Sequence, residues 1–254
     1  MKLDGFVVLV DADNTLWDTN ALFAAAQVTL LEFVERTTGR KCPVPDRLAF
    51  VRSYDQALAS RHHLHLKYPV QMLVATLADA LISQASPVIA AESILQGRQS
   101  ADHLSSKTRN DAISAYVHAL SAAPELLPRV RVGLQLAKDS GLPLFVITEG
   151  KLDLQRKALF AHHLEAYIEN IWELTKTVAQ FQRLVRRFQP AKLIVIGDQP
   201  DRDVVPAHQA GCTTILVRGK FRPGWQSERD ECAADYIARN FVDAVEWLLQ
   251  SAIS

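Results

Sequence analysis

The stretch VLVDADNTLW (8–17) joins an apolar segment to a cluster of polar residues, and the organisation of the chain follows from it. The apolar run FVVLV (6–10) is continuous, which is typical of a strand buried on both faces of a parallel sheet. Two acids, Asp11 and Asp13, follow this run. In extended geometry their side chains point the same way, and two ionised carboxylates repel each other. The segment therefore predicts either a cation beside these acids or one protonated acid, and the alternative is a solvated acidic turn.

Further apolar runs predict more strands of the same sheet. Helical segments lie between them, and an alternation of strand and helix is typical of a doubly wound α/β fold of the Rossmann-like type. In such sheets ligands bind at the carboxyl ends of the strands. The predicted strands are FVVLV (6–10), LPLFVIT (142–148), IENIWEL (168–174), KLIVIG (192–197) and TTILV (213–217), and the helices include RVGLQLAKDSG (131–141) and VAQFQRLVRRF (178–188).

The section between the first and second of these strands has a different character. It contains no comparable strand, and helical periodicity recurs along it between prolines. We predict an α/β core domain formed by residues 1–17 and 129–254, with residues 18–128 inserted as a helical cap domain. Helices are expected at 20–39, 47–63, 70–84 and 106–122.

Composition excludes several classes of protein. The chain has 254 residues, with 28 Lys+Arg against 28 Asp+Glu, so no broad electrostatic attraction to nucleic acid or to an anionic membrane is expected. Its three cysteines are far apart, which predicts neither a disulfide framework nor a zinc motif. The first apolar run is too short for a signal peptide, and no apolar stretch is long enough to span a bilayer. A cytoplasmic protein is expected, monomeric or homodimeric, with a small anionic ligand.

Three more segments place polar residues after predicted strands. LFVITEG (144–150) ends in Thr148, whose hydroxyl and following N–H groups can hold phosphate oxygens or simply cap a helix. KLIVIGDQPDRDV (192–204) brings Asp198 and Asp203, which are suitable for Mg²⁺ but are also common in solvated turns. Lys176 in WELTKT (172–177) lies between these two segments.

Taken in order, these elements resemble the motifs of the haloacid dehalogenase superfamily. VDADNTLW looks like its DxDxT motif, VIT its strand-end Thr/Ser motif, and IGDQPDRD its GDxxxxD motif, and Lys176 matches its lysine motif. The insertion lies where this superfamily carries a helical C1-type cap. Two residues depart from the common pattern: Asn14 stands where glycine is frequent, and Glu149 where a small or amide residue is frequent.

The resemblance implies a Mg²⁺-dependent phosphatase that acts on a small phosphorylated metabolite through an aspartyl-phosphate. Asp11 would be the nucleophile. Asp13 would act as general acid and then as general base. Mg²⁺ would be bound by Asp11, Asp198 and the backbone carbonyl of Asp13.

The same resemblance implies how the phosphoryl group is held. Thr148, the backbone of Glu149 and Lys176 would contact its oxygens. Asp203 would orient Lys176 or a metal-bound water without contacting the phosphoryl group itself. The positively charged cap segment SRHHLHLKYP (60–69) either meets an anionic substrate or is a solvated helix end.

Three other functions fit this fold. A 2-haloacid dehalogenase does not need Asp13, because a leaving halide takes no proton. A phosphonate hydrolase would need a cap lysine to form an imine, and Lys41, Lys67 and Lys107 are the choices. A regulatory protein that binds a phosphorylated ligand without turnover is the third.

Overall fold

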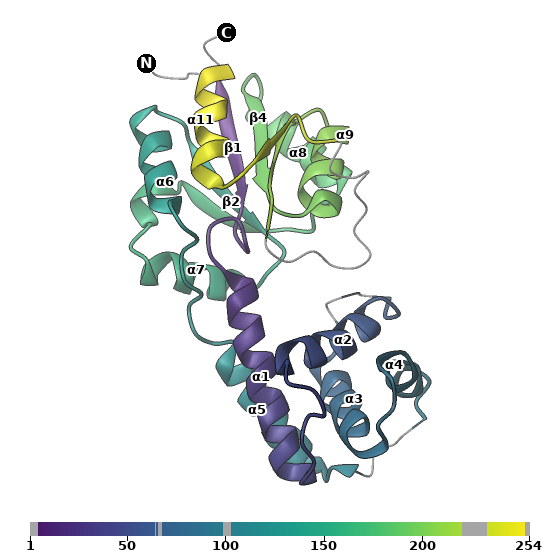
Figure 1. The fold of residues 1–254 in the computed structure, drawn as a ribbon. Helices are drawn as coiled ribbons and strands as arrows, with labels where there is room; N and C mark the ends of the chain where they lie inside the picture. Colours follow the sequence, from purple (N-terminus) through teal and green to yellow (C-terminus); the bar gives the residue numbers. More distant parts are fainter. Residues whose placement is uncertain (1–4, 64, 66–67, 99–102, 220–232, 252–254) are drawn as a thin grey trace. The chain divides into compact units, whose positions relative to one another are not determined.

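The computed structural model describes residues 5–63, 65, 68–98, 103–219 and 233–251, and Lys67 and Cys232 lie outside them. By internal contacts the chain divides into two compact units, drawn in Figure 1. One unit contains the chain up to Asn20 and resumes at Ala123. The other consists mainly of Ala21–Ala122.

The first unit is built on a six-stranded sheet with the order β3-β2-β1-β4-β5-β6, and every neighbouring pair is parallel. The predicted α/β class with a doubly wound parallel sheet is confirmed. The strand β6 was not predicted, because three residues are too few to show a pattern. The strands are β1 (Phe6–Asp11), β2 (Leu144–Thr148), β3 (Asn170–Glu173), β4 (Lys192–Gly197), β5 (Thr213–Val217) and β6 (Tyr236–Ala238).

Helices cover both faces of this sheet (Figure 1). Along β1, Val8 and Val10 belong to the apolar cluster under α6, α7 and α11, whereas Val7 and Leu9 belong to the cluster under α8 and α9. This alternation explains why β1 is apolar at every position from Phe6 to Val10. The helices are α6 (Val130–Asp139), α7 (Leu152–Ala161), α8 (Val178–Phe188), α9 (Val205–Gln209) and α11 (Phe241–Ser251).

The second unit is helical, and its apolar core includes Leu30, Leu58 and Leu77. One of its helices, α4, was not predicted, because prolines were expected to separate the helices of this section. Pro87 is the first residue of α4, a position where proline is favourable since its missing N–H needs no partner there. The helices are α1 (Thr19–Thr38), α2 (Arg47–Ala59), α3 (Val70–Ser83), α4 (Pro87–Leu95) and α5 (Ser106–Ala119).

The two crossings between the units lie a few residues inside the boundaries predicted at 17/18 and 128/129. Both connecting segments are bound to each other within the first unit. The Asp18 N–H donates to the Glu125 carbonyl at 2.7 Å, and the Leu127 N–H donates to the Leu16 carbonyl at 3.0 Å. Among the described helices, none has the length and apolar character needed to cross a membrane.

Candidate active site

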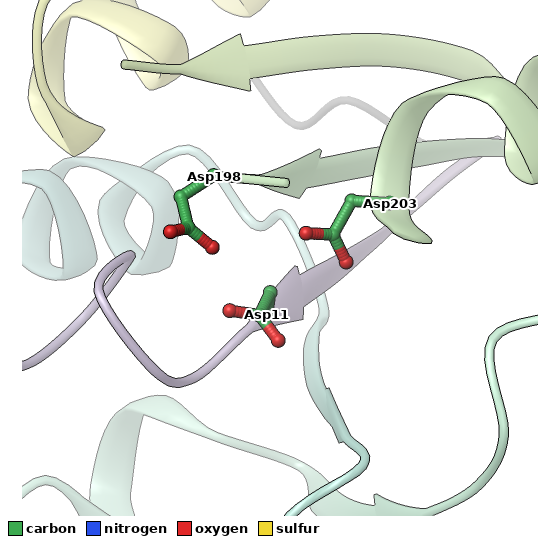
Figure 2. Close-up of side chains that lie close together, drawn as sticks. All are labelled: Asp11, Asp198 and Asp203. Atoms are coloured by element: carbon green, nitrogen blue, oxygen red, sulfur yellow. The ribbon is translucent and has the colours of Figure 1, made fainter. Parts of the chain in front are cut away.

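The predicted acids meet at the carboxyl edge of the sheet. Asp11 is the last residue of β1 and Asp198 directly follows β4, its hydrogen-bonded neighbour. Asp203 lies in a short helix (Pro200–Val204) just beyond. One carboxylate oxygen from each of the three lies within 4.8 Å of the others, and Figure 2 shows the three side chains converging. Parallel strands produce this arrangement, because their carboxyl ends share one edge.

Lys176 follows β3 and is buried among these acids. Its ammonium group donates to Oδ1 of Asp11 and to Oδ1 of Asp203. Burial alone would lower the pKa of Lys176, but the negative charges of Asp11 and Asp203 outweigh this effect. The net pKa is above the usual value for lysine, so this side chain stays charged. The sequence did not show that one lysine would bridge two acids.

Asp203 is held against the backbone of β4. Its Oδ2 accepts a hydrogen bond from the Gln199 N–H at 3.0 Å. A Cβ on Gly197 would lie 2.2 Å from Asp203 Cγ, so only glycine allows the carboxylate this close. With one oxygen on Lys176 and the other on Gln199, Asp203 is placed to hold the lysine.

Asp198 has an unsatisfied oxygen. Its Oδ1 is buried and has no hydrogen-bond partner within the described part of the chain. Burial raises the pKa of Asp198, and the charges of Asp11 and Asp203 raise it further. Burial likewise raises the pKa of Asp11, with Lys176 acting in the opposite direction. Three acids around one lysine, with a buried oxygen left over, fit a divalent cation that takes oxygen ligands.

Asp13 lies in the turn after β1, and both of its carboxylate oxygens accept hydrogen bonds. Thr19 Oγ1 donates to Oδ1 at 2.6 Å, and Gln155 Nε2 donates to Oδ2 at 2.8 Å. The turn depends on Asn14, which has a φ of 60°, a left-handed conformation that asparagine tolerates. Its side-chain oxygen also accepts the Asn20 N–H at 2.8 Å. Asn14 therefore adopts the left-handed conformation that glycine commonly adopts in such turns.

The segment after β2 orients Thr148 and turns Glu149 to a different use. Thr148 is fully buried, and its hydroxyl accepts the Gly150 N–H at 2.9 Å. The Glu149 carboxylate accepts the Lys176 backbone N–H at 2.9 Å and forms an ion pair with Arg202 at 3.4 Å. The charge of Glu149 is thus offset by Arg202, and this carboxylate ties the lysine loop to β2.

Sequence reasoning missed Thr19, Gln155 and Arg202. Each reaches the site from a helix, and only tertiary structure brings it there: Gln155 lies 142 residues from Asp13. The available signal was their closeness to recognised motifs, since Gln155 follows Thr148 by one helical turn and a loop, and Arg202 immediately precedes Asp203.

The positively charged cap segment is partly described. Arg61 forms an ion pair with Glu92 at 3.4 Å, His62 is buried, and the His65 ring lies 3.2 Å from the Ala59 carbonyl. The helix α2 ends at Ala59, so this segment follows the helix and does not continue it as predicted. The two described cap lysines, Lys41 and Lys107, are exposed.

Comparison with solved structures finds the same fold along the whole chain. A predicted phosphoglycolate phosphatase from Haemophilus somnus is 16% identical, with a TM-score of 0.64 over 98% of this chain and 99% of that one. A putative HAD-hydrolase from Bacillus subtilis bound to magnesium is 16% identical, with a TM-score of 0.59 over 98% and 99%. A 2-haloacid dehalogenase from Pseudomonas syringae is 21% identical, with a TM-score of 0.53 over 97% and 99%.

These similarities include both phosphatases and a dehalogenase, so they support the fold and not one reaction. No curated protein sequence matches the chain. A family model described as HAD-hydrolase-like matches residues 156–244, the section that contains Lys176, Asp198 and Asp203. The chain thus has the fold of these hydrolases, and its residues 156–244 match the HAD-hydrolase-like family model, in agreement with the motifs.

Proposed function

We propose that this protein is a Mg²⁺-dependent phosphohydrolase that acts on a small phosphorylated metabolite through an aspartyl-phosphate on Asp11. The observation that carries the proposal is Asp13, a second carboxyl group in the turn after the nucleophile strand, which is hydrogen-bonded to Thr19 and Gln155. Displacement of halide has no use for such a group. Expulsion of an alkoxide from a phosphate ester requires a proton, and Asp13 is the group placed to supply it.

The first half of the reaction transfers the phosphoryl group to the protein. A carboxylate oxygen of Asp11 attacks phosphorus, the bond from phosphorus to the ester oxygen breaks, and the leaving oxygen takes the proton of Asp13. The products of this step are the free alcohol, the aspartyl-phosphate and ionised Asp13. Lys176 and the Thr148 hydroxyl, both buried, would hold oxygens of the transferred group.

The second half releases phosphate. Asp13 removes a proton from water, the resulting hydroxide attacks phosphorus, and the bond to Asp11 breaks. Inorganic phosphate leaves, Asp11 is again a carboxylate, and Asp13 is again protonated. The protein is unchanged over the cycle, and one water is consumed for each phosphate released.

Asp11, Asp198 and the backbone carbonyl of Asp13 are the groups that would hold Mg²⁺. A dianionic phosphate brings two further negative charges to three acids and one lysine. A bound divalent cation supplies the charge that lets the phosphate approach. The buried Asp198 oxygen, which has no partner in the described part of the protein, supports this assignment.

The test is phosphate release from 4-nitrophenyl phosphate, with Mg²⁺ or with excess chelator, by wild type, Asp11→Asn and the exposed control Asp139→Asn. We expect release by wild type and the control only with Mg²⁺, and no release by Asp11→Asn. Halide release from 2-chloropropionate is measured in parallel. Halide release without phosphate release would overturn the proposal in favour of a dehalogenase. Full phosphate release in excess chelator would overturn the assignment of the metal.

A further inference from the structure

Gln155 makes a contact that its place in the fold does not otherwise explain. It lies in α7 and is 5% exposed. Its side-chain Nε2 donates to Asp13 Oδ2 at 2.8 Å. The other end of the amide, Oε1, is buried and has no hydrogen-bond partner among the described residues.

The orphan oxygen argues against a purely structural role. A buried acceptor without a partner is unfavourable for folding, and an apolar side chain of the same length would avoid that cost. The hydrogen-bond network favours this orientation of the amide. Reversing it would leave both Nε2 hydrogens without an acceptor, and it would bring Oε1 against an oxygen of Asp13 whenever Asp13 is ionised. What the amide gains in its present orientation is the contact with Asp13.

Several features bring Gln155 to this position. A Cβ on Gly150 would lie 2.8 Å from Gln155 Nε2 and 3.2 Å from Asp13 Oδ2, so the absence of a side chain there leaves room for the contact. The start of α7 is tied to β3, because the Leu152 N–H donates to Glu173 Oε2 at 3.0 Å. The helix therefore carries Gln155 to the same sheet edge as Asp13.

We infer that Gln155 is a positioning residue that fixes the Asp13 carboxyl group and selects which of its oxygens carries the catalytic proton. The inference rests on the proposed phosphohydrolase function. An amide N–H can only donate, so Oδ2 must accept, and the proton of the neutral acid is held on Oδ1. Thr19 contacts Oδ1 through a hydroxyl, which can accept as well as donate, so this proton remains available for transfer.

This role makes a specific demand on the leaving group. An alkoxide is a poor leaving group and depends on its proton, whereas 4-nitrophenolate leaves with little help. Loss of Gln155 should therefore slow the hydrolysis of alkyl phosphates more than the hydrolysis of 4-nitrophenyl phosphate. The informative quantity is kcat/KM, because it covers the steps up to departure of the alcohol and excludes the hydrolysis that all substrates share.

The experiment compares wild type, Asp13→Asn, Gln155→Met and Gln135→Met on 4-nitrophenyl phosphate and on a panel of small alkyl phosphates. Methionine keeps the length of glutamine and removes the donor. Gln135→Met is the matched control, because Gln135 also donates to an aspartate, Asp139, at 2.7 Å, but in an exposed pair outside the site. Melting temperature is recorded for each variant.

For Gln155→Met we expect kcat/KM to fall about tenfold more on alkyl phosphates than on the aryl substrate. A tenfold difference is only part of the rate acceleration that a general acid contributes. Asp13→Asn should show the same bias more strongly, and Gln135→Met none. An equal loss on both substrates by Gln155→Met, or no loss, would overturn the inference while the Asp13→Asn bias keeps the phosphohydrolase function intact. Absence of the bias in Asp13→Asn as well would count against the proposed function itself.

Discussion

Glu35 in the helical unit and Asp198 in the sheet unit are acids held in opposite ways. In the helical unit, Glu35 is buried and its oxygens accept from both terminal nitrogens of Arg47, at 3.2 and 3.0 Å, and from the Cys42 N–H at 2.8 Å. Burial alone would raise the pKa of Glu35, but these donors and nearby positive charges hold it below the usual value. In the sheet unit, Asp198 has a raised pKa, and one of its buried oxygens has no partner among the residues that the structure describes.

This difference separates a structural acid from one suited to chemistry. The chain itself supplies every partner that Glu35 needs, so the charge is satisfied when the protein folds. The acids at the sheet edge are undersupplied, since Lys176 is shared between Asp11 and Asp203. An undersupplied buried acid is stabilised when it takes up a proton or when a cation binds to it.

The largest effect is expected from Lys176→Met. The variant removes the ammonium group that we propose holds the phosphoryl group, and we expect kcat/KM for phosphate release to fall by about 10²–10³-fold. The control is Lys192→Met, an exposed lysine at the first position of β4 and so at the opposite end of that strand. A loss of less than about tenfold for Lys176→Met would show that the lysine serves folding and not the phosphate.

The next effect is a dependence of stability on pH in the metal-free protein. Burial raises the pKa of Asp11 to about 8, and Asp198 shifts in the same direction. A raised folded-state pKa means that the protonated acid favours folding. The stabilisation is therefore complete below the unfolded pKa, about 4, and is lost as the pH rises towards 8.

Melting temperatures of wild type and Asp198→Asn, measured between about pH 5 and pH 8 without metal, check this dependence. We expect wild type to lose stability relative to Asp198→Asn as the pH rises. Mg²⁺ should stabilise wild type more at the upper end of that range, where the acids must ionise. Asp201→Asn, a half-exposed acid of the same short helix, should behave as wild type. Parallel curves for wild type and Asp198→Asn would remove the contrast with Glu35.

What could be predicted from the sequence follows the same division. Asp11, Thr148 and Asp198 each end or directly follow an apolar run, so the strand pattern alone places them at one edge. The roles of Gln155 and Arg202 could not be predicted, because their partners Asp13 and Glu149 are distant in sequence and the helices that carry them show only the usual periodicity. In the helical unit, periodicity predicted four of the helices. The sequence of that unit does not indicate which of its acids have hydrogen-bond or ion-pair partners.

A smaller effect is expected at Arg202, which forms a partly exposed ion pair with Glu149. Arg202→Met should change stability by less than about 1 kcal/mol, as is usual for exposed pairs. Phosphate release should fall only a few-fold, because Glu149 still accepts the Lys176 N–H. Glu149→Ala removes both contacts and should cost about tenfold, comparable with one hydrogen bond that positions a catalytic group. An effect of Arg202→Met equal to that of Glu149→Ala would mean that the ion pair, and not the backbone contact, positions Lys176.

The smallest effects are expected in the helical unit, from Lys41→Met and Lys107→Met. Lys41 is exposed, and its ion pair with Glu35 is long at 3.8 Å, while Arg47 already satisfies the same carboxylate. Each variant should change the free energy of unfolding by less than about 0.5 kcal/mol. The activation free energy for release of phosphate from 4-nitrophenyl phosphate should change by no more than the same amount. Imine chemistry would require a lysine that loses its proton easily, which burial favours and exposure does not. If either variant abolished turnover while Asp13→Asn did not, the chemistry would belong to the helical unit, and the contrast drawn between the two units would be reversed.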